Sequence, residues 1–245
     1  RLSKQLGFEI ESSTKERITA SSELLTTIKQ ERISKEFLNL LVMDGFELIY
    51  KEYSSIFNTI IPEISTISNT KLKNTLNLLK ILHNNHILRL AALFLYTDNN
   101  IEQFKQVALR LHFDKKTIKG VITLLKYAKT DLKPDKKSIL ALIREVNIQN
   151  VALLFAFKYA FYTIENKDTL TLAEIQALYQ KEIDEITQMK VQNLSINISK
   201  IEEMGYSSAD SAVIYETIKG KIINNELPNS ENSLKPYILK HYKRS

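Results

Sequence analysis

Lysine side chains are the residues of this sequence whose type and spacing point most directly to chemistry. Eight of them fall in one stretch in the middle of the chain, at Lys115, Lys116, Lys119, Lys126, Lys129, Lys133, Lys136 and Lys137. The first five recur at intervals of about three, four and seven residues, so one helix edge can present ammonium groups along a phosphate backbone. A point charge cannot read a base with two parallel hydrogen bonds, so such an edge would recognise backbone and shape.

The distribution of charge supports this reading. Eight Lys against three Asp give residues 111–140 a net charge of +5, almost the whole excess of +6 carried by the chain. Tyr127 lies among these lysines and can either stack on a base or pack half-buried in the protein. Lys240, in a basic group near the C-terminus, is a further candidate for phosphate contact. The alternative is that the lysines form a solvated face that only keeps the protein soluble.

Carboxylates and histidines do not form a catalytic set in this sequence. Nucleotidyl transfer needs two carboxylates that jointly hold Mg²⁺. Glu182 and Asp184 are two residues apart on a predicted helix, so they project to nearly opposite sides. His83 and His86 have no adjacent acid, and the sequence contains no glycine-rich phosphate loop and no cysteine nucleophile. We therefore predict that this segment contains no catalytic residue, no metal site and no cofactor of its own.

Composition predicts an all-α fold. The 245 residues include only five Gly and four Pro, whereas average usage would give roughly 17 and 12. Alternating runs typical of strands are short and lack hairpin turns. No run approaches the roughly 18 apolar residues of a membrane span, and the lack of cysteine suits a reducing cytoplasm. We expect a helical, soluble, cytoplasmic protein that makes no membrane contact.

Apolar periodicity places the helices. Ser13 and Glu16 have capping-box spacing and predict the start of a first helix that buries Leu24 and Leu25. A second helix from Glu31 should bury one face, and a third should run from residue 46 to Ile61, where Pro62 stops it. Residues 151–164 are apolar nearly all round and predict a buried helix. Residues 171–190 predict a long amphipathic helix that packs through Ile175, Leu178, Ile183 and Ile186.

Two runs near the start keep the residues of a known family in order and spacing. The pattern R-F-x-x-x-L-G-F-x-I is matched by Arg1, Leu6, Gly7, Phe8 and Ile10. The pattern I-x-x-E-R-I-x-x-E-x-x-x-L-L is matched by Ile28, Glu31, Arg32, Ile33, Glu36, Leu40 and Leu41. Residues 1–41 thus resemble the neck of bacterial class II tRNA nucleotidyltransferases, the CCA-adding enzymes and related poly(A) polymerases. Leu2 stands where Phe is usual, and Lys29 replaces the residue that normally caps the second helix.

The C-terminal part resembles the tail of the same family. Its plan is followed by Leu194, Ile196, Lys200, Ile201, Ile223, Asn225, Leu227 and Asn229. The glycines and prolines of the family's turn are missing, because Ile198 replaces a loop glycine and residues 207–209 stand at the usual Lys-Pro-Gly-Pro. The middle of the chain, residues 60–190, matches no motif.

The resemblance implies an elongated multi-helix array with a neck at 1–60, a body at 61–190 and a tail at 191–245. The neck residues Arg1, Glu31, Arg32 and Glu36 would support the nucleotide pocket, and the basic residues, Lys200 and Lys240 included, would bind RNA. The parent enzyme would add C, A or CCA to tRNA 3′ ends, using Mg²⁺ and CTP or ATP. Its catalytic carboxylates would lie in a head domain upstream of Arg1, so this segment alone should be inactive. Its partners would be the tRNA acceptor arm and that head.

Two alternatives from other classes stay open at this point. One is a helical protein-interaction scaffold without enzymatic activity. The other is a DNA-binding helix-turn-helix around residues 101–130, because a basic helix is predicted there after a short turn. The sequence leaves open which nucleotide is added and which oligomer forms.

Overall fold

The computed structural model describes residues 1–224 and 226–242 of the chain. These residues form fifteen α-helices and two short 3-10 helices, and none of them lies in a β-strand. The all-α prediction is therefore confirmed, because few glycines and prolines interrupt the helices. Among the same residues, no single helix combines the length and the apolar character that a membrane crossing requires.

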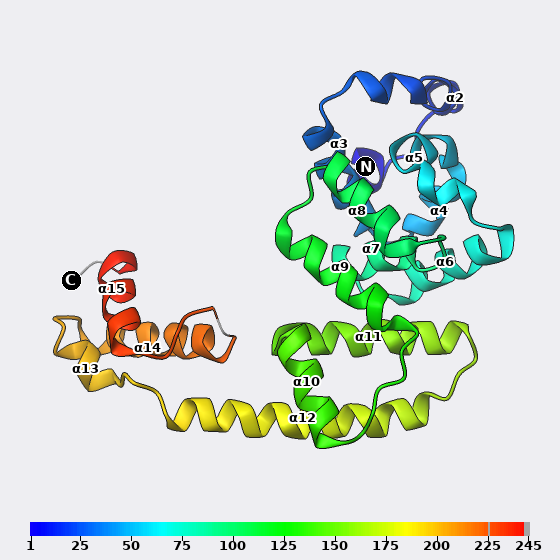
Figure 1. The fold of residues 1–245 in the computed structure, drawn as a ribbon. Coiled ribbons are helices and arrows are strands. Elements are labelled where there is room, and N and C mark those ends of the chain that lie inside the picture. The colour runs from blue at the N-terminus through cyan, green and yellow to red at the C-terminus, as the bar shows by residue number, and fades with distance from the viewer. Residues whose placement is uncertain (225, 243–245) are drawn as a thin grey trace. The chain divides into compact units, whose positions relative to one another are not determined.

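Two compact units divide the chain (Figure 1). Unit 1 contains Arg1–Asp131 and Ala152–Leu172, and unit 2 contains Leu132–Val151 and the residues from Ala173 onward. Unit 1 holds α1 (Leu2–Leu6), α2 (Ser12–Ala20), η1 (Ser22–Thr27), α3 (Gln30–Leu41), α4 (Phe46–Glu52), α5 (Ser54–Ile60), η2 (Pro62–Thr66), α6 (Asn69–Ile81), α7 (His86–Phe94), α8 (Asn100–Arg110) and α9 (Lys115–Ala128). Unit 2 holds α10 (Lys136–Val146), α13 (Ile198–Glu202), α14 (Ser208–Ile223) and α15 (Glu231–His241), whereas α11 (Ile148–Ile164) and α12 (Thr169–Gln192) contribute residues to both.

An aromatic cluster holds the first helices of unit 1 together. The buried face predicted for α3 is confirmed, since Ile33, Phe37 and Leu41 are buried. The Phe57 ring lies 5.2 Å, centroid to centroid, from both Phe46 and Tyr50. Tilted and stacked rings at this separation contribute stability beyond the area they bury.

The prediction of one helix from residue 46 to Ile61 is wrong, because the structure has two. The chain leaves helical geometry at Tyr53, with φ −121° and ψ 37°, and α5 begins at the next residue. A single straight helix would separate Phe46 from Phe57 by about 16 Å along its axis, since each residue rises about 1.5 Å. Only a break lets both rings enter one cluster.

The predicted capping box at Ser13 is also wrong. The N-cap of α2 is Glu11, and it accepts no side-chain hydrogen bond, so Ser13 already lies inside the helix. The helix ends at Ala20, and Leu24 in η1 is exposed instead of packing in a stripe. No residue of α2 is buried. The helix therefore lacks the packing of an apolar face that would stabilise a longer helix through Leu24.

A buried arginine ties the end of α3 to α7. The Arg89 guanidinium donates hydrogen bonds to the carbonyl oxygens of Leu41 and Met43, each at 2.7 Å, and to Asn84 Oδ1 at 2.6 Å. Burial lowers the pKa of Arg89 from its ordinary value. Next to it, the Asn85 side chain accepts the amides of Ile87 and Leu88 and so caps the start of α7.

A buried lysine links α11 to the end of α9. Residues 151–164 form a largely buried helix as predicted, but the apolar pattern gave no sign that Lys158 would be 0% exposed. Its ammonium group donates to the carbonyl oxygens of Tyr127, Ala128 and Thr130 at 3.1, 3.2 and 2.7 Å. These carbonyls lie at the C-terminal end of α9, where helix geometry leaves acceptors unpaired and favours a cation.

Unit 2 has a core of its own. An apolar stripe of α14, formed by Ile214, Ile218 and Ile222, is buried together with Leu234 and Ile238 of α15. In α12 the predicted stripe is wrong at Leu178, which is 41% exposed, whereas Leu172 and Tyr179 are buried. The buried positions of α12 also include Glu182, which an ion pair with Lys136 at 3.1 Å allows to leave water.

Candidate RNA-binding site

A tight turn at the end of α1 presents an aromatic ring. Gly7 has φ 73° and ψ 23°, a left-handed conformation that glycine adopts without steric cost. The amides of Gly7 and Phe8 both donate to the carbonyl oxygen of Ser3, the latter at 3.1 Å, as in a Schellman motif. The turn fixes the backbone of Phe8, whose side chain is nevertheless 55% exposed.

Two hollows are lined in part by this aromatic residue. Phe8, Glu9 and Ile10 line both of them, together with Ile18. The first measures about 520 Å³ and has an apolar floor made by Leu40, Ile49, Ile56 and Phe57. The second, of about 710 Å³, reaches Thr14, Arg32 and Glu36. Both volumes fall within the range of small-ligand sites.

Ion pairs join charged residues that line these hollows. Arg1 Nε lies 2.5 Å from a Glu36 carboxylate oxygen, and Lys15 Nζ lies 2.7 Å from Glu52. The hydrogen bond from Arg1 lowers the pKa of Glu36, and the bond to Glu52 raises the pKa of Lys15. All four side chains are partly exposed, so these pairs contribute little net stability and orient the groups instead.

The predicted neck set is only partly brought together. Arg1 and Glu36 meet, although they are far apart in sequence. Glu31 lies 4.0 Å from His112 Nε2 and faces away from this pair. Arg32 lines the second hollow, and among the described residues no ion pair joins it to Glu36, its neighbour at helical spacing. Whether these four residues support a nucleotide pocket stays a prediction.

Sequence reasoning did not single out Phe8 as a binding residue. It appeared there only as a match to the family pattern. One signal in the sequence could have pointed to Phe8. It is an aromatic residue directly after a glycine, in a polar run between Lys4 and Lys15. Exposure and the two hollows become visible only in the folded chain.

Five of the predicted lysines lie on α9 or at its C-terminal end, in unit 1. Asp114 caps this helix by accepting the amide and the hydroxyl of Thr117 at 2.9 and 2.7 Å, and these bonds lower the pKa of Asp114. Lys115, Lys116 and Lys119 follow the cap and are exposed. Further along, Lys126 lies over the ring of Tyr127 at 5.0 Å, and Lys129 lies 5.9 Å from the centroid of Tyr96. Tyr127 is half-buried.

The remaining predicted lysines of this stretch belong to unit 2. Lys133 and Lys137 are exposed. Lys136 forms ion pairs with Glu182 and Glu185, each at 3.1 Å. The hydrogen bond to Glu185 raises the pKa of Lys136 most, followed by the bond to Glu182. The predicted set is therefore divided between the two units, and Lys136 has protein partners of its own.

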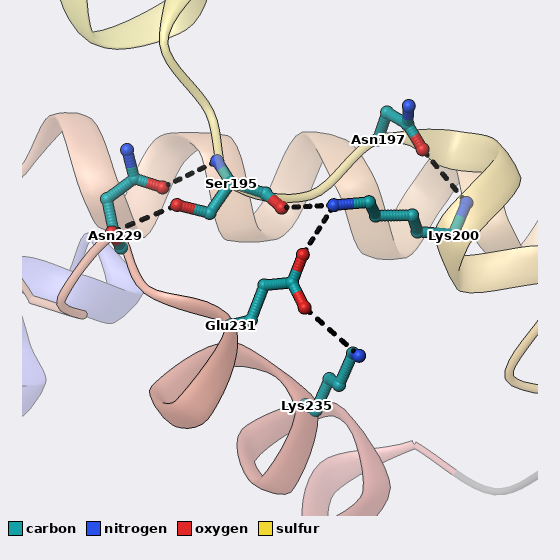
Figure 2. Close-up of polar contacts among 6 residues, drawn as sticks. All are labelled: Ser195, Asn197, Lys200, Asn229, Glu231 and Lys235. Atoms are coloured by element: carbon teal, nitrogen blue, oxygen red, sulfur yellow. Dashed lines mark hydrogen bonds and ion pairs between the residues drawn. The ribbon is translucent and has the colours of Figure 1, made fainter.

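In the tail, Lys200 belongs to a polar network shown in Figure 2. Its ammonium group donates to the Ser195 carbonyl oxygen at 3.1 Å and pairs with the Glu231 carboxylate, which also accepts from Lys235. Asn229 receives the Ser195 amide at 2.9 Å and so ties the same segment of chain to the start of α15. Lys200 thus links α13 to α15, and its part in RNA binding stays a prediction, as does that of the exposed Lys240.

A comparison with known proteins bears on the site around Phe8. The geometry is that of an exposed aromatic residue and cationic side chains beside two hollows, an arrangement typical of nucleic-acid-binding surfaces. Residues 7–67 match a family model described as the probable RNA- and SrmB-binding site of polymerase A. The match covers about a quarter of the chain and includes Phe8 and most of the residues that line the hollows. No curated protein matches the chain significantly. Residues 7–67 therefore resemble the RNA-binding site of polymerase A.

Proposed function

We propose that this chain is the RNA-binding portion of a nucleotidyltransferase that extends the 3′ end of tRNA. One observation carries the proposal: the match to the RNA-binding site of polymerase A falls on the segment that holds Phe8 and the two hollows. The residue patterns around Gly7 and Glu31 favour the CCA-adding branch of this family. In this proposal the neck, body and tail are residues 1–60, 61–190 and 191–245.

The chemistry in this proposal is divided between two parts. This chain holds the acceptor arm of tRNA through the site at Phe8 and through phosphate contacts on the lysine edge of α9. The carboxylates that hold Mg²⁺ and act on CTP or ATP belong to a separate head domain. Arg1, Glu31, Arg32 and Glu36 brace the nucleotide pocket from behind. A cytoplasmic location stays a prediction.

The lysine edge gives the direct test of tRNA binding. We expect the combined change Lys115→Glu, Lys116→Glu and Lys119→Glu to weaken tRNA binding strongly at low salt. It should also reduce the slope of log affinity against log salt by about 2 to 3, because each phosphate contact on a duplex contributes about 0.9. Filter binding across a salt series measures both quantities.

The matched control changes three exposed lysines that lie elsewhere, Lys73, Lys80 and Lys181, to glutamate. It makes the same change in net charge, so a specific edge requires a much smaller loss of affinity in the control. Equal losses would mean that net charge alone governs binding. No loss in either variant would favour the protein-interaction scaffold.

One observation favours a protein-interaction scaffold as the second candidate function. The matching family description names SrmB beside RNA, so the region of that family is described as contacting a protein as well. DNA binding is tested in the same assay. Residues 111–114 form a short turn between α8 and α9, and competition by duplex DNA equal to that by tRNA would support a helix-turn-helix.

We further expect this chain alone to incorporate neither CTP nor ATP into tRNA. The reason is that several carboxylates serve in ion pairs and helix caps, such as those of Glu36 and Asp114, and that no group of three or more metal-binding side chains occurs among the described residues. Incorporation of labelled nucleotide in the presence of Mg²⁺ measures this. Any templated or untemplated addition by the purified chain would contradict the assignment of catalysis to a separate head.

A further inference from the structure

The position of Phe8 raises a question that phosphate binding does not answer. Large apolar side chains are normally buried, and the aromatic residues of the neighbouring helices, Phe37, Phe46 and Phe57, are almost wholly buried. Phe8 instead keeps half of its surface in water. Its backbone is held by the left-handed Gly7 and by the bond to Ser3, so the turn fixes the point from which the ring projects.

The surroundings of the ring suit a planar group better than a phosphate. The first hollow beside it has an apolar floor, and its charged lining mixes Arg1, Lys4 and Lys15 with Glu9 and Glu52. A lining of mixed charge, with three cationic and two anionic side chains, attracts a polyanion only weakly. It does accept the flat face of a base on the ring while a single cation, such as that of Lys4, meets the adjoining phosphate.

We propose that Phe8 is the stacking platform for one unpaired base, so that this site takes single-stranded RNA and not a duplex. The proposal rests on the proposed RNA-binding function and adds the substrate class. In a duplex every base face is covered by its neighbours, whereas bases in single-stranded RNA can be splayed out and stacked on aromatic side chains. The lysine edge of α9 holds phosphates of any strand, and the Phe8 site selects the strand that has free bases.

The chain offers a clean probe because it contains no tryptophan. The change Phe8→Trp places the chain's single tryptophan at the proposed platform, where it can be excited apart from the 11 tyrosines. We expect a short single-stranded RNA to quench this fluorescence through base stacking, and a fully paired RNA of the same sequence to leave it nearly unchanged. Circular dichroism checks that the variant is as helical as the parent.

A matched control uses Leu48→Trp. Leu48 lies on α4 in the same matched region, is 57% exposed compared with 55% for Phe8, and lines neither hollow. Quenching confined to the Phe8→Trp chain supports the proposal. Equal quenching in both variants, or equal quenching by single and paired RNA, overturns it.

A second measurement separates stacking from charge. Phe8→Ala should weaken binding of the single strand about tenfold or more, because stacking on an aromatic ring is worth that much per base. It should leave the salt slope unchanged, since Phe carries no charge. Phe8→Tyr should restore the affinity, and Lys4→Ala should lower the slope by about 0.7.

Failure of this proposal and failure of the proposed function give different results. If RNA binds with a steep salt dependence but Phe8→Ala loses no affinity, the stacking site is overturned and RNA binding stands. If neither single-stranded nor paired RNA binds the parent chain at any salt concentration, both are overturned.

Discussion

At the scale of single residues, the most informative side chains are charged groups inside the protein. Arg89 and Lys158 lie in unit 1 and bind backbone carbonyl oxygens, not carboxylates. Burying a charge is costly unless it is hydrogen-bonded, and both groups meet this condition by capping helix ends. They fix helix termini that apolar packing alone would leave free to shift.

Lys158 leads to a prediction about pH. Burial lowers its pKa to about 8 from an ordinary value of 10.5. Between these values the unfolded chain keeps the proton and the folded chain releases it, so the free energy of unfolding should rise with pH. The slope can reach about 1.4 kcal/mol per pH unit. Urea unfolding between pH 7 and pH 10 measures this rise, which the variant Lys158→Met should lack.

The control is Lys73→Met, which removes an exposed lysine of α6 in the same unit. That variant should keep the rise between pH 8 and pH 10. Comparing each variant with the parent at every pH also cancels the opposing effect of Tyr50 and Tyr96, whose pKa values burial raises. An identical pH profile for the parent and Lys158→Met would show that the lysine is not buried in solution.

At the scale of elements, helix positions were easier to predict than helix faces. The breaks before α7 and before η2 follow from Asn85 and Pro62, whose effects act on neighbouring residues. The continuous helix through Tyr53 and the stripe of α12 through Leu178 were wrong. Both errors arise because several apolar faces fit one segment, and the partner that selects among them is distant in sequence.

Two helical glycines make a matched test of helix packing. A Cβ on Gly120 of α9 would lie 2.9 and 3.0 Å from side-chain atoms of Ile87 on α7, whereas one on Gly220 of α14 meets nothing within 4 Å. We expect Gly120→Ala to destabilise the protein by about 1 to 3 kcal/mol through overpacking. Gly220→Ala should stabilise it by about 0.5 to 1 kcal/mol through helix propensity. Thermal or urea unfolding measures both.

The double variant Gly120→Ala with Ile87→Val tests the cause. A smaller side chain at residue 87 makes room for the new methyl group, so it should recover part of the loss. Equal effects of the two glycine changes would mean that α7 and α9 are less closely packed than the structure shows.

At the scale of the whole molecule, two compact units carry separate cores. The segment at 7–67 that matches the family model lies in unit 1, and the core built on Ile214, Ile218 and Ile222 lies in unit 2. The division into neck, body and tail rests on sequence patterns of a family, whereas the two units rest on contacts within the folded chain. It stays a prediction.

The separation of cores predicts separable effects of mutation. Ile218 is 0% exposed, so Ile218→Ala should cost about 2 to 5 kcal/mol in the stability of the tail core. Hydrogen exchange of the α14 amides should report this loss. Base stacking at residue 8, followed by the fluorescence of the Phe8→Trp chain, should not change.

The exposed Val213 on the same helix provides the control, since Val213→Ala should alter neither measurement. A loss of RNA-induced quenching in the Ile218→Ala chain, with native helix content in unit 1, would contradict the separation of the two sites.

The sequence by itself determined the helical class, most helix positions and the charge excess around α9. It also showed the resemblance of the opening residues to a polymerase family. These properties depend on composition and on neighbours a few positions apart. Only the tertiary structure decided that Arg1 meets Glu36, that Lys200 pairs with Glu231, that Lys158 is buried and that Phe8 stands exposed beside two hollows. Each of these depends on contacts between distant segments, which form only when the chain buries one apolar face among several candidates.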